Sequence, residues 1–393
     1  MCYKSGSNWA AFLILVQIIL LKTIEHFIHN RLLQREQENS LRVLKTENDL
    51  KDFCSNDYLG FARSTDLKIL FESALKDYPD YKIGSTGSRL LAGNDWFTEE
   101  LENEIAQFHQ AEAALIFNSG YAANLGLFSS IPQRGDTIIT DELIHACIID
   151  GARLSHANRY IFKHNNLNSL EEKLKVSKGN IFIAVESIYS MDGDEAPLVE
   201  ICLLAKKYGA AVIVDEAHAT GIFGPNGSGL VQELGLENEI FARVITFGKG
   251  LGTHGAVVIG SNSLRSYLIN FARSFIYTTA ASFPTHLATK MAYDYLKSTN
   301  HQQPIKERIN RFREELNSVH SLVPSRSAIQ AVLIPGNGNV KAIATQLQKD
   351  GFDVRPILSP TVSVGSERLR ICLHNFNTFE DIASLTSKLK KLL

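Results

Sequence analysis

The stretch "RVITFGKGLGTHGAVVIGS" (243–261) places one lysine, Lys249, in a turn with almost no other side chains. A lysine that forms an imine and then carries a proton needs open space around its amine. Glycines provide that space because they have no side chain. The turn therefore predicts a Schiff-base lysine beside a flat cofactor, although a lone loop lysine more often points into water. The surrounding glycines are Gly248, Gly250, Gly252 and Gly255.

Two nucleotide-binding alternatives for this turn fail on their sequence context. The G-x-G-x-x-G match that begins at Gly250 should lead into a helix and, about 20 residues later, to an acidic ribose ligand. It leads instead into a second apolar run, and no Asp or Glu occurs between Glu239 and Asp294. A P-loop needs Ser or Thr after its Gly-Lys pair, but Gly250 follows Lys249. We therefore expect no nucleotide at this turn.

Three further features could share a site with Lys249. Asp215 ends the apolar run "AAVIV", and an acid at the carboxyl end of a parallel strand points into the ligand crevice, where it can pair with the ring nitrogen of pyridoxal phosphate. His218 lies three residues later, and Asp215 could alternatively cap a helix in "DEAH". The turn "NSGYAAN" (118–124) could hold a phosphate on its amide groups, together with the hydroxyl of Thr246. Along the chain, the phosphate turn comes first, the strand-end Asp215 second and the lysine turn third, and this order on one sheet favours a phosphate-bearing cofactor.

A parallel sheet is needed to bring these groups together, and the pattern from about 98 to 290 predicts one. Apolar β-branched runs alternate there with helical segments, which is typical of a largely parallel sheet covered on both faces. The last hundred residues have an α+β pattern instead. We expect a large α/β domain beside a smaller α+β domain built from both chain ends. The expected parts are an apolar extension at 1–21, a small-domain segment at 22–60, a large domain at 61–290 and the rest of the small domain at 291–393.

Composition excludes some functions and places the chain in a reducing compartment. The 393 residues carry a net charge of −2, which gives no reason to expect nucleic acid as a partner. Five scattered cysteines without a C-x-x-C pair indicate reduced thiols and a cytoplasmic protein. The apolar segment 9–21 is shorter than the roughly 20 residues of a membrane span. This favours a packed or dimer-covered helix, or a mis-called start codon, over membrane contact.

Over about 35–393, the ordered motifs of the chain resemble the α-oxoamine synthases. These motifs are "CSNDYLG" (54–60), "GSTGSRLLAGN" (84–94), "FTEELENEIA" (97–106), "FNSGYAAN" (117–124), "DELIHACIIDG" (141–151), "ESIYSMDGD" (186–194), "DEAHATGIFGPNGSG" (215–229), "TFGKGLGTHGA" (246–256) and "SPTVSVGSERLRI" (359–371). The resemblance implies a pyridoxal 5'-phosphate-dependent transferase of fold type I, the aspartate aminotransferase fold, with no metal. It also implies a homodimer with shared active sites.

The resemblance implies a role for each matching residue. Lys249 holds the cofactor and moves the proton, Asp215 pairs with the ring nitrogen, and His145 stacks on the ring, although "DELIHA" also fits a helix start. Alternation puts Arg368 and Arg370 on the same face of the strand and does not choose between them. The resemblance selects Arg370 as the clamp for the amino acid carboxylate, which would leave Arg368 as a surface ion-pair residue. The other implied cofactor contacts are Gly120, Tyr121, Ser190, His218, Thr246, Thr278 and Thr279, the last two reaching the partner subunit; the other substrate contacts are Asn56, Thr361 and Arg42.

The implied reaction is a decarboxylating condensation of an amino acid with an acyl thioester. The sequence after the lysine turn, Thr253 to Ala256, most resembles the branch that joins L-alanine to a pimeloyl thioester, on coenzyme A or acyl carrier protein, in biotin synthesis. The 2-amino-3-ketobutyrate ligase, serine palmitoyltransferase and 5-aminolevulinate synthase branches remain alternatives. Another is a non-catalytic, membrane-associated subunit, against which the intact Lys249 argues. The chain departs from the family pattern in residues 1–21 and in an insertion at Ile357–Ser359.

Overall fold

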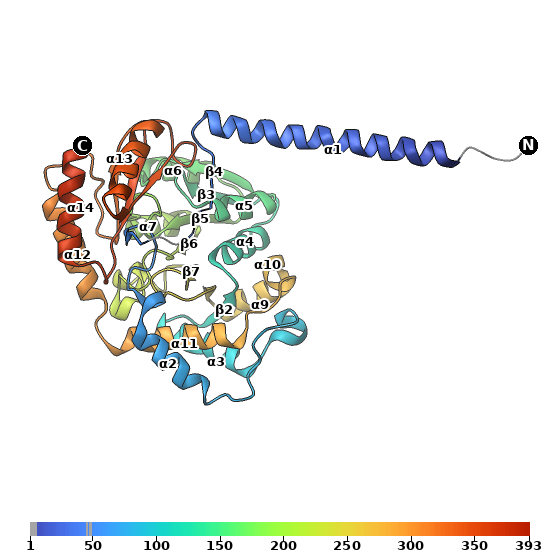
Figure 1. The fold of residues 1–393 in the computed structure, drawn as a ribbon. Helices are drawn as coiled ribbons and strands as arrows, with labels where there is room; N and C mark the ends of the chain where they lie inside the picture. Colours follow the sequence, from blue (N-terminus) through green and yellow to red (C-terminus); the bar gives the residue numbers. More distant parts are fainter. Residues whose placement is uncertain (1–5, 45, 47–48) are drawn as a thin grey trace, which may run out of the picture.

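The computed structural model describes residues 6–44, 46 and 49–393, with the backbone alone for 6–12 and 14–21. A seven-stranded sheet with the order β2-β8-β7-β6-β5-β3-β4 forms the centre of the molecule (Figure 1). Only β8 runs antiparallel to its neighbours, β2 and β7. The strands are β2 (Ala113–Phe117), β3 (Thr137–Asp141), β4 (Asn158–Phe162), β5 (Ile181–Glu186), β6 (Ala211–Asp215), β7 (Ala242–Thr246) and β8 (Ala256–Gly260). The expected mostly parallel α/β sheet is confirmed.

Helices cover both faces of this sheet because its central strands are apolar on both sides. One face packs against α4, α5, α9 and α10, and the other against α3, α6, α7 and α11. The helices of this part are α2 (Thr65–Leu75), α3 (Trp96–Phe108), α4 (Gly120–Ser130), α5 (Ala146–Leu154), α6 (Leu167–Val176), α7 (Leu198–Tyr208), α8 (Leu230–Glu233), α9 (Asn262–Phe271), α10 (Arg273–Ile276) and α11 (Phe283–Ser298). Short turns of other helix types lie at Phe61–Arg63, Arg89–Gly93 and Pro225–Gly227.

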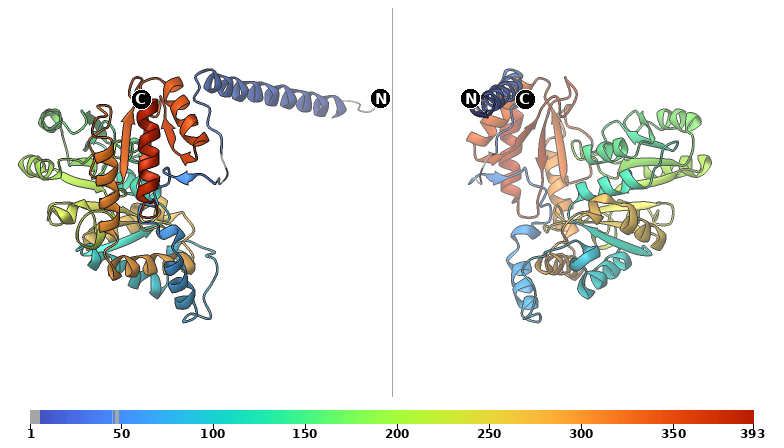
Figure 2. Two further views of the ribbon diagram at one scale, coloured as in Figure 1. Left: turned by 60° about the vertical axis from the view of Figure 1, so that its left-hand side comes forward. Right: turned by 90° about the vertical axis from the view of Figure 1, so that its right-hand side faces the viewer.

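The C-terminal part is a second, smaller α+β layer beside the large sheet (Figure 2). Its antiparallel sheet has the order β11-β12-β9, and the segment before residue 60 joins it where β1 pairs with β10. This pairing brings the "CSNDYLG" motif to the boundary between the two parts. The elements are β1 (Lys51–Asp52), β9 (Ile329–Leu333), β10 (Phe352–Asp353), β11 (Arg355–Ile357), β12 (Arg368–Cys372), α12 (Gln302–Glu315), α13 (Asn337–Lys349) and α14 (Phe379–Leu392).

Helix α1 (Gly6–Gln37) projects away from the rest of the chain in Figure 1 and in the left view of Figure 2. It continues without interruption across residue 21, so the apolar segment 9–21 and the charged segment after it form one helix. Exposed apolar side chains follow one another along its second half at Ile24, Phe27, Ile28 and Leu32. In the part of the chain that the structure describes, no helix has the length and apolar character needed to cross a bilayer.

Candidate active site

Lys249 lies in the turn between β7 and β8, and its Nζ is 2.7 Å from Nε2 of His218. The glycines around it are needed for close backbone contact as well as for open space. A Cβ on Gly250 would lie 2.5 Å from the carbonyl oxygen of Thr220, and Gly252 has a φ of +62°. Burial lowers the pKa of the Lys249 amine, although the charges of Asp215 and Glu186 oppose this shift. The neutral amine needed for imine formation and proton transfer is thereby favoured.

Asp215 ends β6 as expected, and both of its carboxylate oxygens accept hydrogen bonds. Oδ2 accepts from Nδ2 of Asn124 at 2.7 Å, and Oδ1 accepts from the backbone amide of Ala217 at 2.9 Å. These bonds fix the carboxylate at the carboxyl edge of the sheet. Asn124 lies on α4 and is buried, so the helix that follows the phosphate turn also positions the acid.

His218 is buried beside Lys249, and its ring is held at both nitrogens. While Nε2 faces the lysine, Nδ1 lies 2.7 Å from Oη of Tyr58. Burial, followed by the positive charges of Lys249 and Arg370, holds the pKa of His218 well below its usual value. The imidazole is therefore neutral at ordinary pH, and it can accept a proton on one nitrogen while donating from the other.

Glu186 is a buried acid that the sequence analysis did not single out. It ends β5 directly opposite Asp215 in the sheet register. Burial, and then the charge of Asp215, raise its pKa to about 8. Its Oε2 accepts from the amide of Ser190 at 3.2 Å, whereas its Oε1 is buried without a hydrogen-bond partner. A strand-end Glu one strand away from Asp215 is the signal that could have identified it.

The expected phosphate contacts surround the first turn of α4. Ser119 caps this helix, and Gly120 and Tyr121 are its first residues. A Cβ on Gly120 would lie 2.6 Å from Oγ1 of Thr246, so only glycine allows the threonine hydroxyl to approach the helix end. The amides and hydroxyls together form a cradle that fits a phosphate group. Tyr121 is half-exposed and donates from its hydroxyl to Asp150.

Thr278 and Thr279 lie in the loop after α10 and close to this cradle. Nδ2 of Asn118 donates to Oγ1 of Thr278 at 3.1 Å and to the carbonyl oxygen of Thr279 at 2.8 Å. Asn118 begins the "NSGYAAN" turn, so the loop and the cradle are joined within one chain. Whether Thr278 and Thr279 also reach a partner subunit stays a prediction.

The other expected ring contact, His145, occupies the N-terminus of α5. Its side chain accepts from the backbone amide of Cys147 as the N-cap, and its Nδ1 lies 2.9 Å from the Cys147 Sγ. The helix-start reading of "DELIHA" therefore holds for the local structure. A stacking role on a bound ring is compatible with this position and stays a prediction.

The arginine expected to bind the amino acid carboxylate projects from β12 into the boundary between the two parts of the chain. Arg370 is buried, donates from Nε to the carbonyl oxygen of Ser190 at 2.6 Å, and donates from NH2 to Oδ1 of Asn56 at 2.9 Å. Three of the expected residues, which come from distant parts of the sequence, are thus brought together. The guanidinium is fixed before any substrate binds.

Arg368 differs from the expectation. It is buried, with 6% of its surface exposed, and forms an ion pair with the buried Asp192 of the "SMDGD" loop. The expectation of a surface ion pair was wrong because strand alternation shows only that Arg368 and Arg370 share a face. It does not show that the loop after β5 covers that face.

Arg42 and Thr361 meet in a separate hollow. NH2 of Arg42 donates to Oγ1 of Thr361 at 3.3 Å. The hollow has a volume of about 250 Å³, and the insertion Ile357–Ser359 lines part of it. No described hydrogen bond joins these two residues to the group around Lys249. Their role as acyl-substrate contacts stays a prediction.

The described residues contain no group of His, Cys, Asp or Glu side chains arranged to hold a metal ion. By contrast, a phosphate cradle, a fixed strand-end acid and a lysine of lowered pKa lie on one edge of the sheet. This donor set fits pyridoxal phosphate: Gly120, Tyr121 and Thr246 would hold its phosphate, Asp215 its ring nitrogen and Lys249 its aldehyde carbon.

Comparison with known proteins agrees with this fit. The family model described as aminotransferase class I and II matches residues 48–384. An 8-amino-7-oxononanoate synthase of Emericella nidulans is 44% identical over 358 residues, which are 85% of this chain and 87% of that protein.

Two solved structures are similar over nearly their whole length. A serine palmitoyltransferase from S. paucimobilis with a bound PLP–myriocin aldimine has a TM-score of 0.83 at 27% identity, over 95% of this chain and 98% of that one. An 8-amino-7-oxononanoate synthase from Francisella tularensis has a TM-score of 0.75 at 28% identity, over 88% and 98%. The fold type I expectation is confirmed.

Proposed function

Since this chain belongs to the aminotransferase class I and II family, we propose that it is a pyridoxal-phosphate-dependent acyltransferase of biotin synthesis, an α-oxoamine synthase. It joins L-alanine to a pimeloyl thioester and releases 8-amino-7-oxononanoate, carbon dioxide and the free thiol carrier. The observation that carries the proposal is the position of the Lys249 amine, 2.7 Å from the neutral His218 in a cluster with Asp215.

The residues around Lys249 can perform the proton transfers that this reaction requires. When bound, pyridoxal phosphate supplies a ring that stabilises negative charge on the amino acid α-carbon. The Lys249 Nζ, whose pKa is lowered by burial, takes the α-proton and later returns it to the product. Asp215 keeps a negative charge at the ring nitrogen, and its two hydrogen bonds prevent it from turning away.

The substrates bind at the boundary between the two parts of the chain. Arg370 binds the carboxylate of the amino acid as a planar fork, and Asn56 and Ser190 keep that fork oriented. Arg42 and Thr361 bind the acyl substrate in their own hollow.

The proposal extends to assembly and location. The enzyme is a homodimer in which Thr278 and Thr279 complete the phosphate site of the partner, and it works in the cytoplasm. The free thiols of the four described cysteines support that location. The acyl carrier is coenzyme A or acyl carrier protein.

A second candidate is serine palmitoyltransferase activity, because a protein of that name superimposes with a TM-score of 0.83. An assay that crosses alanine, glycine and serine with pimeloyl-, acetyl- and palmitoyl-coenzyme A, and with pimeloyl acyl carrier protein, separates the candidates. We expect the alanine and pimeloyl pair to give the fastest release of carbon dioxide and a product of the mass of 8-amino-7-oxononanoate. Faster turnover of serine with palmitoyl-coenzyme A would replace the proposal with the second candidate.

A further inference from the structure

A continuous chain of hydrogen bonds joins the Lys249 amine to the Arg370 guanidinium. From Lys249 it passes to Nε2 of His218 at 2.7 Å, and from Nδ1 of His218 to Oη of Tyr58 at 2.7 Å. It then continues from Tyr58 to Oδ1 of Asn56 at 3.0 Å, and Arg370 donates to that same oxygen at 2.9 Å. Tyr58 and Asn56 belong to the "CSNDYLG" motif, and Tyr58 was not among the expected site residues.

The direction of every bond in this chain follows from the Arg370 end. A guanidinium can only donate, so the Asn56 atom that faces it is the carbonyl oxygen, which can only accept. The hydroxyl proton of Tyr58 is directed to that oxygen. Because a phenol has a single proton, Oη must accept the proton of His218 Nδ1. The Nε2 lone pair then faces Lys249 and accepts one of its amine protons.

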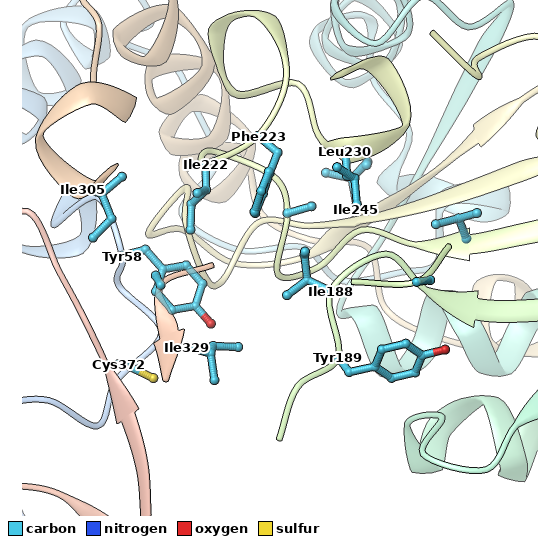
Figure 3. Close-up of a cluster of buried hydrophobic side chains, with 14 of the residues drawn as sticks. Tyr58, Ile188, Tyr189, Ile222, Phe223, Leu230, Ile245, Ile305, Ile329 and Cys372 are labelled. Atoms are coloured by element: carbon cyan, nitrogen blue, oxygen red, sulfur yellow. The ribbon is translucent and has the colours of Figure 1, made fainter. Parts of the chain in front are cut away.

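The Tyr58 side chain is held too firmly for its hydroxyl to exchange its donor and acceptor partners by moving. Its side chain is fully buried and belongs to the same apolar cluster as Ile329 and Cys372 (Figure 3). Burial also raises the pKa of its phenol well above the usual range, so the hydroxyl keeps its proton. Its Oη is therefore a fixed point between His218 and Asn56.

We propose that Tyr58 is a positioning residue that holds His218 as the Nδ1–H tautomer and thereby links the Lys249 amine to Arg370. The importance of this link for catalysis rests on the function proposed above. The assignment of the His218 tautomer does not depend on that function. In this arrangement Nε2 of His218 orients the lysine lone pair and protons. A carboxylate that binds Arg370 alters the polarity of the hydrogen bonds from Asn56 through Tyr58 to His218. This in turn alters the hydrogen bond between His218 and the Lys249 amine.

The test uses nitrogen-15 NMR of the histidine rings in the cofactor-free protein, with His218→Gln to assign the signal. We expect His218 in the wild type to show a protonated Nδ1 and an unprotonated Nε2. Tyr58→Phe removes only the hydroxyl and should shift both signals toward each other as the tautomers mix. Tyr293→Phe is the matched control, because it removes a buried hydroxyl that donates to Nε2 of His109 at 3.0 Å, while the Ser228 carbonyl accepts from Nδ1 of that ring. That change should alter His109 and leave His218 unmoved.

A second variant predicts which tautomer of His218 should form. It also tests the proposal if the Tyr58→Phe chain does not fold. Asn56→Leu removes the oxygen that accepts the Tyr58 proton, so that proton should turn to Nδ1 of His218 and drive the ring to the Nε2–H tautomer. A protonated Nε2 in the wild type would overturn the proposal. So would an unchanged His218 signal in a folded Tyr58→Phe chain or in Asn56→Leu.

A third measurement examines the link to the substrate in the loaded enzyme. Tyr58→Phe should raise the half-saturating concentration of alanine in spectral titration by about 2- to 10-fold, the effect of one lost hydrogen bond. Ethylamine, which lacks the carboxylate, should bind the two proteins equally. Equal binding of alanine by both proteins would overturn the link. If the NMR result holds but the wild type does not turn over alanine, the proposed function fails while the tautomer assignment stands.

Discussion

Arg368 and Asp192 form an ion pair that is buried between β12 and the loop after β5. Removal of one partner would leave the other charge buried without a counter-charge, which typically costs about 3–5 kcal/mol. We therefore expect Asp192→Ala to lower the free energy of unfolding by about that amount, as measured by urea denaturation.

The neighbouring pair of Arg326 and Glu195 provides the control. The Arg326 side chain is 63% exposed. Glu195 is 26% exposed and accepts two hydrogen bonds from Arg326, but solvent at the arginine weakens the pair, so Glu195→Ala should lower the free energy of unfolding by clearly less than Asp192→Ala does. A similar loss for Asp192→Ala and Glu195→Ala would show that burial does not distinguish the two pairs.

Lys249 should be the residue that carries the cofactor. Its lowered pKa and its glycine turn make it the amine suited to imine formation. Borohydride reduction of the loaded enzyme followed by peptide mapping should label Lys249 alone. Lys249→Ala should lose the visible absorption after dialysis, whereas Lys290→Ala, which breaks an ion pair with Glu104 on α3, should retain it. A label on another lysine would show that this other residue, and not Lys249, carries the cofactor.

His164 should make the stability of the protein depend on pH. Burial opposes its charge, yet hydrogen bonds to Asp141 at 2.9 Å and Asp194 at 2.7 Å raise its pKa to about 9. The value in the unfolded chain is about 6.5. Because the folded pKa is the higher one, the added stability is fully present below pH of about 6.5 and is lost as pH rises through 9.

The two pKa values would give a stabilisation of about 3 kcal/mol for a fully buried group, and because water partly screens His164 we expect a smaller value. His164→Gln should therefore flatten the fall in the free energy of unfolding between pH 6.5 and 9.5. His320→Gln, at an exposed histidine, should retain the wild-type slope. If the slope of His164→Gln matches that of the wild type, another group causes the fall.

The sequence was most informative where a site residue belongs to a regular local pattern. Lys249 stands in a glycine turn and Asp215 at the end of an apolar strand, so both could be found without tertiary structure. Asn124 and Tyr58 could not, because each acts through a contact with a residue 91 or 160 positions away. Strand β4 was also missed, since only the last of its five residues is buried and its apolar pattern is weak.

The last prediction concerns the recognition of the amino acid. Arg370 presents a planar fork that matches a carboxylate at two points, and a lysine at this position would keep the charge but lose the fork. We expect Arg370→Lys to weaken alanine binding by about 1.5–3 kcal/mol, the contribution of a hydrogen bond to a charged group. The partners Ser190 and Asn56 would also be left without their donor, so the substrate effect must be separated from a general loss of order.

Titration with two ligands makes that separation. Alanine and ethylamine share the amine and differ in the carboxylate, so only alanine should bind more weakly to Arg370→Lys than to the wild type. Arg311→Lys is the control, because Arg311 is half-exposed and pairs with Glu315 within α12, so this change should leave both ligands unaffected. Equal weakening of alanine and ethylamine would indicate that Arg370 supports the structure of the site. In that case the carboxylate would be bound elsewhere, since a contact with Arg370 acts only on the ligand that carries the charge.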